Sequence, residues 1–302
     1  MNRLSHLNRT VRFFALAVVV ALAGSTAALA KVEKDTIKRS FNVERGGTLY
    51  VDIDRGNVIV EAIDGSQVHV EMERFVNHRD ADQVKRVLAR HEWEIEGDDD
   101  DVVIESRFEQ GEGRNRWRNT ENFRLRVTVK VPYEYNVDFS SGAGNVTISD
   151  LRGYVDGRTG AGNIRIGEVN GDVELHAGSG NVDVDGVVGE LEVHVGAGNV
   201  TLGYVDGEIQ AATGSGNITA RITRQPSDES TLESGAGNVV VYLRDEIGLY
   251  VDAKTSVGSA SCAFGLEVEG RWMSKSFAGE VNGGGPDLTL RSGVGNVSLR
   301  RM

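Results

Sequence analysis

The sequence contains almost no cysteine. Cys262 is the single cysteine in 302 residues, so an intramolecular disulfide is impossible and thiol redox chemistry is not expected. The fold must therefore be held together by a packed core. Even without its first thirty residues, the chain is long enough for one large domain or one extended repeat array.

Long apolar runs are also missing after residue 30, where no stretch approaches the ~20 apolar residues of a membrane-spanning helix. Before that point the chain has three early arginines, an apolar run and a small-x-small site, namely Arg3, Arg9, Arg12, residues 13–23 and Ala28-Leu29-Ala30. This order predicts a secretory signal peptide over residues 1–30, the alternative being an uncleaved membrane anchor. We expect an exported protein in the periplasm, at the cell surface or secreted, with no transmembrane segment after signal cleavage.

Basic residues are too few to balance the acidic ones. The chain has 33 Lys and Arg against 45 Asp and Glu, a net charge of −12. The first thirty residues contain three Arg and no acid, so their removal leaves 30 bases against 45 acids, or −15. This charge argues against nucleic acid and anionic membrane surfaces as partners, and it suits solubility or a cationic partner.

Catalytic signatures are absent as well. The sequence shows no Ser/His/Asp constellation, no nucleophile elbow and no phosphate-binding loop. Its Gly-x-Gly strings do not resemble dinucleotide sites, because they recur between strands rather than opening a helix. We therefore expect no enzyme activity, no cofactor and no metal.

What the sequence does have is an internal repeat. The string Gly-x-Gly-Asn, followed by a β-branched residue, recurs through the second half, and its first four intervals are identical in length. A degraded copy surrounds Ser259, and Asn57 belongs to an isolated early copy. The repeated asparagines are Asn145, Asn163, Asn181, Asn199, Asn217, Asn238 and Asn296.

Alignment of the repeats predicts an all-β fold. Apolar and polar residues alternate with period two in two short runs per repeat, as in strands with one buried face. One run begins at Val155, Val173, Leu191 and Ile209, and the other at Ile164, Val182, Val200 and Ile218. We therefore predict a single-chain β-solenoid with coils of about 18 residues, each coil stacked on the next at ~4.8 Å.

The repeated asparagine has two interpretations. In the structural one it occupies a corner, where it adopts a left-handed conformation or hydrogen-bonds the turn backbone, and identical neighbours form an amide ladder. In the functional one the asparagines form a linear ligand-binding array. The adjacent glycines favour the structural interpretation.

The region before the repeats has a different organisation. Residues 31–135 contain further alternating strands, a helix expected near 80–91 and a Gly-, Arg- and Asn-rich loop over 109–121. The helix is expected to cover an open end of the solenoid. Residues 136–302 form the repeat solenoid, continuous with the preceding strands.

Taken together, the Gly-x-Gly-Asn coils, the early Gly56-Asn57-Val58 copy and the closing Gly293-Val294-Gly295-Asn296 string resemble the bacterial "putative adhesin" family of unknown function, similar to the head GIN domain. The resemblance covers nearly all of residues 40–302. It implies a β-solenoid at the cell envelope or surface and brings no catalytic residues.

Contact residues are expected on the outward positions between the motifs. His176 and His194 are one repeat period apart and should stack, with Glu174 and Glu192 beside them and Asp156 one coil earlier. This column is a solvated contact face or, alternatively, a transition-metal site. The acidic run 98–101 is expected to be a turn rather than a calcium site, because it lacks alternating ligand spacing.

Three functions remain open at this stage. The favoured one is a noncatalytic, adhesin-like or envelope-associated module that binds an envelope protein or polymer. The second is a self-assembling structural solenoid, and the third is a polysaccharide-active β-helix enzyme. Short corners and the lack of a clustered catalytic site argue against the third.

Overall fold

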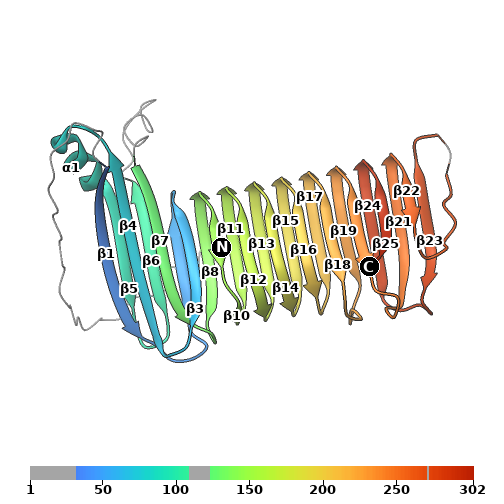
Figure 1. Cartoon of the computed structure of the whole chain (residues 1–302), viewed down its shortest axis with the longest axis horizontal. Coiled ribbons are helices and arrows are strands. Elements are labelled where there is room, and N and C mark those ends of the chain that lie inside the picture. The colour runs from blue at the N-terminus through green and yellow to red at the C-terminus, as the bar shows by residue number, and fades with distance from the viewer. Residues whose placement is uncertain (1–31, 109–122, 271) are drawn as a thin grey trace.

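The computed structural model describes residues 32–108, 123–270 and 272–302. The signal peptide expected over 1–30 and the loop expected over 109–121 lie outside the described residues. In the described ranges the chain forms two long sheets that run side by side along an elongated body, with the colours advancing in order through the middle coils and out of order at both ends (Figure 1). The predicted β-solenoid is confirmed.

The first sheet, called sheet A here, has thirteen strands among the described residues. In spatial order they are β1 (Val32–Asn42), β4 (Gln67–Asn77), β7 (Phe123–Pro132), β3 (Asn57–Ile63), β9 (Val146–Ile148), β12 (Ile164–Asn170), β14 (Val182–Val188), β16 (Val200–Val205), β18 (Ile218–Ile222), β20 (Val239–Leu243), β25 (Val297–Arg301) and β22 (Ala260–Cys262), with β10 (Leu151–Arg152) pairing with β12.

The second sheet, sheet B, has twelve strands in the same described ranges. Their spatial order is β23 (Lys275–Val281), β21 (Leu249–Val257), β24 (Asp287–Val294), β19 (Ser230–Ala236), β17 (Ile209–Ser215), β15 (Leu191–Ala197), β13 (Val173–Ser179), β11 (Val155–Ala161), β8 (Asn136–Ala143), β2 (Thr48–Ile53), β6 (Val102–Phe108) and β5 (His91–Gly97).

The core lies between the inner faces of the two sheets. Burial alternates over the first five residues of each sheet B repeat strand and the first three of each sheet A repeat strand, so Val173 and Leu175 point inward while Glu174 lies between them on the outer face. Equivalent residues pair in register across parallel strands, for example Val173 with Leu191 and Val182 with Val200. Because full burial of one such aliphatic side chain is worth about 1.5–3 kcal/mol, these columns supply the main stabilisation.

Gly157 shows how a glycine can occupy an inward position of this pattern. The Phe139 ring from the preceding coil lies where its side chain would be, and a Cβ on Gly157 would stand 2.2 Å from that ring. One large aromatic residue therefore fills the space of two neighbouring core positions.

The repeated asparagines sit at the corner after each sheet B strand, and the amide ladder is confirmed. The Asn163 Oδ1 accepts a hydrogen bond from the Asn181 backbone N–H at 2.9 Å, and the Asn181 Oδ1 accepts one from Asn199 at 3.0 Å. The left-handed conformation suggested for these asparagines is wrong. The glycine before each one has the positive φ instead, such as 126° at Gly180, where a Cβ would also lie 2.0 Å from the Gly162 carbonyl oxygen.

The last coils do not stack in sequence order. β24 lies between β19 and β21, although β21 precedes it in the chain, and β23 returns antiparallel on the outer side of β21. The coil of Asn296 therefore rests on that of Asn238, and the degraded copy at Ser259 rests on Asn296. A simple sequential stack is thus wrong at this end, because the closing coil is inserted as a parallel strand into both sheets.

The first coil is also assembled from distant segments. β3 pairs with β9 and β2 pairs with β8, so the early copy at Asn57 stacks directly on Asn145, 88 residues later. The expected helix is α1 (Ala81–Ala89), which begins at the N-cap Asp80 and packs its buried Val84 at the N-terminal end of the array, against β4 and β5 (Figure 1). No helix in the described ranges has the length and apolar character that crossing a membrane requires.

Candidate functional site

The candidate contact residues lie on the outer face of sheet B. Strand alternation places Asp156, Glu174 and Glu192 in one outward column, paired in register along β11, β13 and β15. Two residues later in the same strands, His176 and His194 occupy a second outward column. Because parallel strands are separated by about 4.8 Å, each column presents one side chain per coil at that interval.

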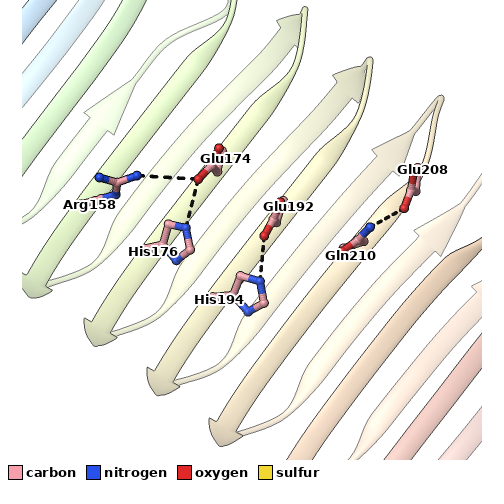
Figure 2. A network of polar contacts seen from close by, with 7 residues as sticks. All are labelled: Arg158, Glu174, His176, Glu192, His194, Glu208 and Gln210. Carbon is pink, nitrogen blue, oxygen red and sulfur yellow. Dashed lines mark hydrogen bonds and ion pairs between the residues drawn. The ribbon is translucent and has the colours of Figure 1, made fainter. Parts of the chain in front are cut away.

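The two histidines form a parallel stack, as their spacing predicted. Their ring centroids are 5.3 Å apart, and the ring planes differ by 10°. The His176 Nε2 lies 3.1 Å from the Glu174 Oε1, and the His194 Nε2 lies 2.9 Å from the Glu192 Oε1. Figure 2 shows both Glu–His pairs repeating from one strand to the next.

These pairs fix how each imidazole is presented. An ionised carboxylate only accepts hydrogen bonds, so Nε2 of each ring donates to its glutamate. The Nδ1 atoms of His176 and His194 are then acceptors when the rings are neutral and donors when they are protonated. Each pair therefore offers a fixed carboxylate and a ring nitrogen of variable role, repeated over two coils.

Two neighbours extend this network. The Arg158 guanidinium lies 3.8 Å from the Glu174 Oε1, and the Gln210 Nε2 donates to the Glu208 Oε1 (Figure 2). Arg158 stands one coil before His176 in the same column, so its position follows from the repeat period, although sequence reasoning did not select it. The outward face is thus polar over at least four consecutive coils.

A groove of about 1200 Å³ runs beside the histidine column. Its floor is formed by successive glycines, Gly142, Gly160, Gly178, Gly196 and Gly214. A Cβ on Gly178 would lie 2.5 Å from the Gly160 carbonyl oxygen, and a Cβ on Gly196 would lie 2.5 Å from the Gly178 carbonyl oxygen. Side chains are therefore excluded from the floor because the coils stack too closely, and this column was missed when glycine was considered only as a turn residue.

A second groove, of about 990 Å³, follows the acidic column. Carboxylates line most of it, and among the described residues Arg158 is the one Lys or Arg in its lining. The carboxylates are those of Asp52, Asp101, Glu105, Asp138, Asp156, Asp172, Glu174, Glu190, Glu192 and Glu208. This half of the sheet B face is therefore strongly negative.

Local contacts modify the charges at both ends of the face. Burial raises the pKa of Asp101, although a hydrogen bond from the Thr48 backbone N–H opposes this effect. At the other end, hydrogen bonds from the Arg291 guanidinium lower the pKa of the Asp252 carboxyl group. The carboxylate of Asp252 is therefore held ionised by a partner on the adjacent strand.

The acidic run 98–101 closes a turn. The Asp98 Oδ1 accepts hydrogen bonds from the backbone N–H groups of Asp100 and Asp101, and the Asp101 Oδ1 accepts one from Thr48. These oxygens stabilise the β5–β6 connection. Across the described chain, no group of three or more His, Cys, Asp or Glu side chains is arranged to hold a metal ion.

Comparison with known proteins gives one match over most of the chain. The model of a family described as Toastrack DUF4097 matches residues 48–300. A search of curated proteins finds no match.

Solved structures with remote similarity include three bacterial proteins. A "putative cell adhesion protein" from Clostridium sporogenes is 14% identical over 89% of this chain and 100% of its own, with a TM-score of 0.26. A "putative adhesin" from Bacteroides fragilis is 14% identical over 89% and 97%, with a TM-score of 0.30. A "putative lipid binding protein" from Parabacteroides distasonis is 11% identical over 87% and 96%, with a TM-score of 0.27.

Proposed function

The chain belongs to the Toastrack DUF4097 family, and we propose that it is an exported, noncatalytic, adhesin-like module that binds an envelope protein or polymer along the outer face of sheet B. The observation that carries the proposal is the groove beside the stacked Glu–His pairs. Both the groove and the pairs follow the solenoid axis, so an extended ligand would meet equivalent groups coil after coil.

The chemistry of this face favours a ligand with repeated polar groups. Glu174 and Glu192 offer acceptors, while in the neighbouring column Arg158 offers donors and each imidazole Nδ1 accepts when the ring is neutral or donates when it is protonated. Hydroxyl and amide groups both donate and accept, so they can pair with either column. A rigid sheet also loses little conformational freedom on binding, which favours affinity.

Self-assembly is the weaker proposal because the edge strands at the N-terminal end carry charges. The β1 edge includes Lys34, Lys38 and Arg39, and the β5 edge includes Glu92 and Glu94. Charged side chains on edge strands oppose the addition of another strand. We therefore expect a monomer whose apparent mass does not change with concentration.

The proposal is tested by replacing the two Glu–His pairs together. A variant carrying Glu174→Ala, His176→Ala, Glu192→Ala and His194→Ala should bind the ligand that the wild-type protein captures from envelope extract at least about tenfold more weakly. This loss corresponds to about 1.4 kcal/mol of binding free energy. Thermal unfolding followed by circular dichroism verifies that the variant folds.

The matched control is Arg165→Ala with Asp183→Ala, an exposed ion pair of 3.4 Å on the outer face of sheet A. It removes charged side chains without touching the groove and should leave capture unchanged. Equal capture by all three proteins would contradict the proposed surface. Release of new reducing ends from a glycan panel would contradict the noncatalytic assignment.

A further inference from the structure

A second polar surface lies on the opposite sheet, in the C-terminal coils. Tyr204, Arg221, Tyr242 and Arg300 are paired in register on β16, β18, β20 and β25, so they form one outward column in which tyrosine and arginine alternate. We call this column the Tyr–Arg ladder. The Glu–His pairs of the proposed binding face belong to sheet B and take no part in it.

Tyr242 holds two guanidinium groups, one on each side. The Arg221 guanidinium carbon lies 5.7 Å from its ring centroid, and that of Arg300 lies 5.9 Å from it. Because β20 lies between β18 and β25, the two arginines approach the ring from opposite sides. The aromatic ring therefore separates and orients two planar cations through cation–π contacts.

Neither of these guanidinium groups is neutralised by the described residues. Three neighbouring arginines each have an acidic partner, since Arg224 pairs with Asp206, Arg244 with Glu246 and Arg301 with Asp245. For Arg221 and Arg300 no carboxylate of the described chain lies within 4.0 Å, and both side chains are exposed. These five arginines and their three acidic partners sum to +2 around Tyr242, whereas beyond Tyr204 the same column continues through Gly186 to Glu168, a carboxylate that hydrogen-bonds the Tyr204 side chain.

We propose that the Tyr–Arg ladder binds a linear acidic polysaccharide through oxyanion groups repeated about 10 Å apart, the distance of two strand spacings. Guanidinium groups donate two parallel hydrogen bonds to a carboxylate or phosphate, and Arg221 and Arg300 have those donors free. Both faces of Tyr242 are already occupied by arginine, so the ring has no face on which a nucleobase could stack. This arrangement favours an acidic glycan over single-stranded nucleic acid.

The test measures binding of four probes: polygalacturonate, which carries carboxylates, a phosphate-bearing glycan, neutral dextran and a single-stranded DNA oligonucleotide. At about 20 mM salt the full chain should bind one or both acidic probes and not dextran, and binding should weaken steeply as salt rises. The acidic probe that binds more tightly identifies the source of the oxyanions.

Two double variants distinguish paired hydrogen bonding by a guanidinium group from simple attraction between opposite charges. Arg221→Ala with Arg300→Ala should weaken binding by at least about tenfold. Arg221→Lys with Arg300→Lys should retain only part of the wild-type affinity, because lysine keeps the positive charge but cannot donate two parallel hydrogen bonds. The fourfold Glu–His variant should bind the acidic probes as the wild type does, so failure of one surface is distinguishable from failure of the other. The inference is overturned if wild type binds neither acidic probe, if the double alanine variant binds equally well, or if single-stranded DNA binds more tightly than both glycans.

Discussion

His91 is an imidazole enclosed by aromatic rings at the N-terminal end of the core. Its ring centroid lies 5.0 Å from that of Phe108 and 4.9 Å from that of Phe123, and its Nε2 is 2.8 Å from the Ser106 Oγ. Its Nδ1 is buried and has no hydrogen-bond partner among the described residues. Burial and, to a lesser extent, the positive charge of Arg74 lower the pKa of His91 to about 4.

This environment predicts a loss of stability in acid. The folded-state pKa of His91 is about 4, below its ordinary value of 6.5, so the unfolded chain binds more protons between these pH values. The contribution of His91 is fully present above about pH 6.5 and falls as the pH decreases towards 4, by up to about 3 kcal/mol. Urea unfolding from pH 7 to pH 4 measures it.

The matched variant is His91→Gln, which retains a polar group but does not titrate. Its unfolding free energy should depend less on pH than that of the wild type over this interval. If the two proteins gave parallel curves, the acid sensitivity would have to come from other groups.

The corner asparagines act at the scale of the structural element, because each one joins two coils. The Asn181 Oδ1 accepts hydrogen bonds from the Asn199 backbone N–H at 3.0 Å and from its Nδ2 at 3.2 Å. Asn181→Ala removes both and should lower the free energy of unfolding by about 1–2 kcal/mol while leaving ligand capture intact. Thermal or urea unfolding followed by circular dichroism checks the first expectation.

A nearby substitution provides the control. Asp183→Ala, on the same corner-to-strand segment, removes an exposed ion pair with Arg165 and should cost less than about 1 kcal/mol. Unchanged unfolding of the Asn181 variant together with lost capture would instead favour the interpretation of the asparagines as a ligand-binding array.

At the scale of the whole molecule, the inserted closing coil makes distant segments depend on each other. β24 pairs with β19 on one side and β21 on the other, and Leu290 at its centre is fully buried. Leu290→Asp would place an unpaired charge in the core, so both β19 and β21 should lose amide-exchange protection. Coils in solenoids contact mainly their neighbours, so β13 should keep its protection. Continued protection of β19 would contradict this dependence.

The whole molecule also presents two faces of different charge. Sheet B carries the acidic column with Glu174 and Glu192, whereas the C-terminal half of sheet A carries the exposed arginines of the Tyr–Arg ladder. Because a solenoid holds its two sheets on opposite sides of one core, two ligands could be bound without competing for space. The proposed experiments therefore examine the two faces with separate variants.

The sequence by itself determined the coil length, the inward and outward alternation and the stacking of His176 on His194. These features depend on a constant repeat period, and parallel in-register pairing converts such a period directly into columns. The outward positions of Asp156, Glu174 and Glu192 could therefore be predicted, whereas their role in contact stays a prediction. The glycines of the groove floor follow the same period. The reason for them, the close approach of backbone carbonyl groups in stacked coils, is visible only in the structure.

Only the tertiary structure decided which coils are neighbours at the two ends and which residues form the Tyr–Arg ladder. The ladder residues are unevenly spaced along the chain, because a register shift between Leu202 and Tyr204, a loop insertion and the inserted closing coil each break the period. Pairing between strands depends on which edges meet when the chain closes, and not on their distance in sequence. The repeat therefore specified each coil, while the packing of distant edges specified their order.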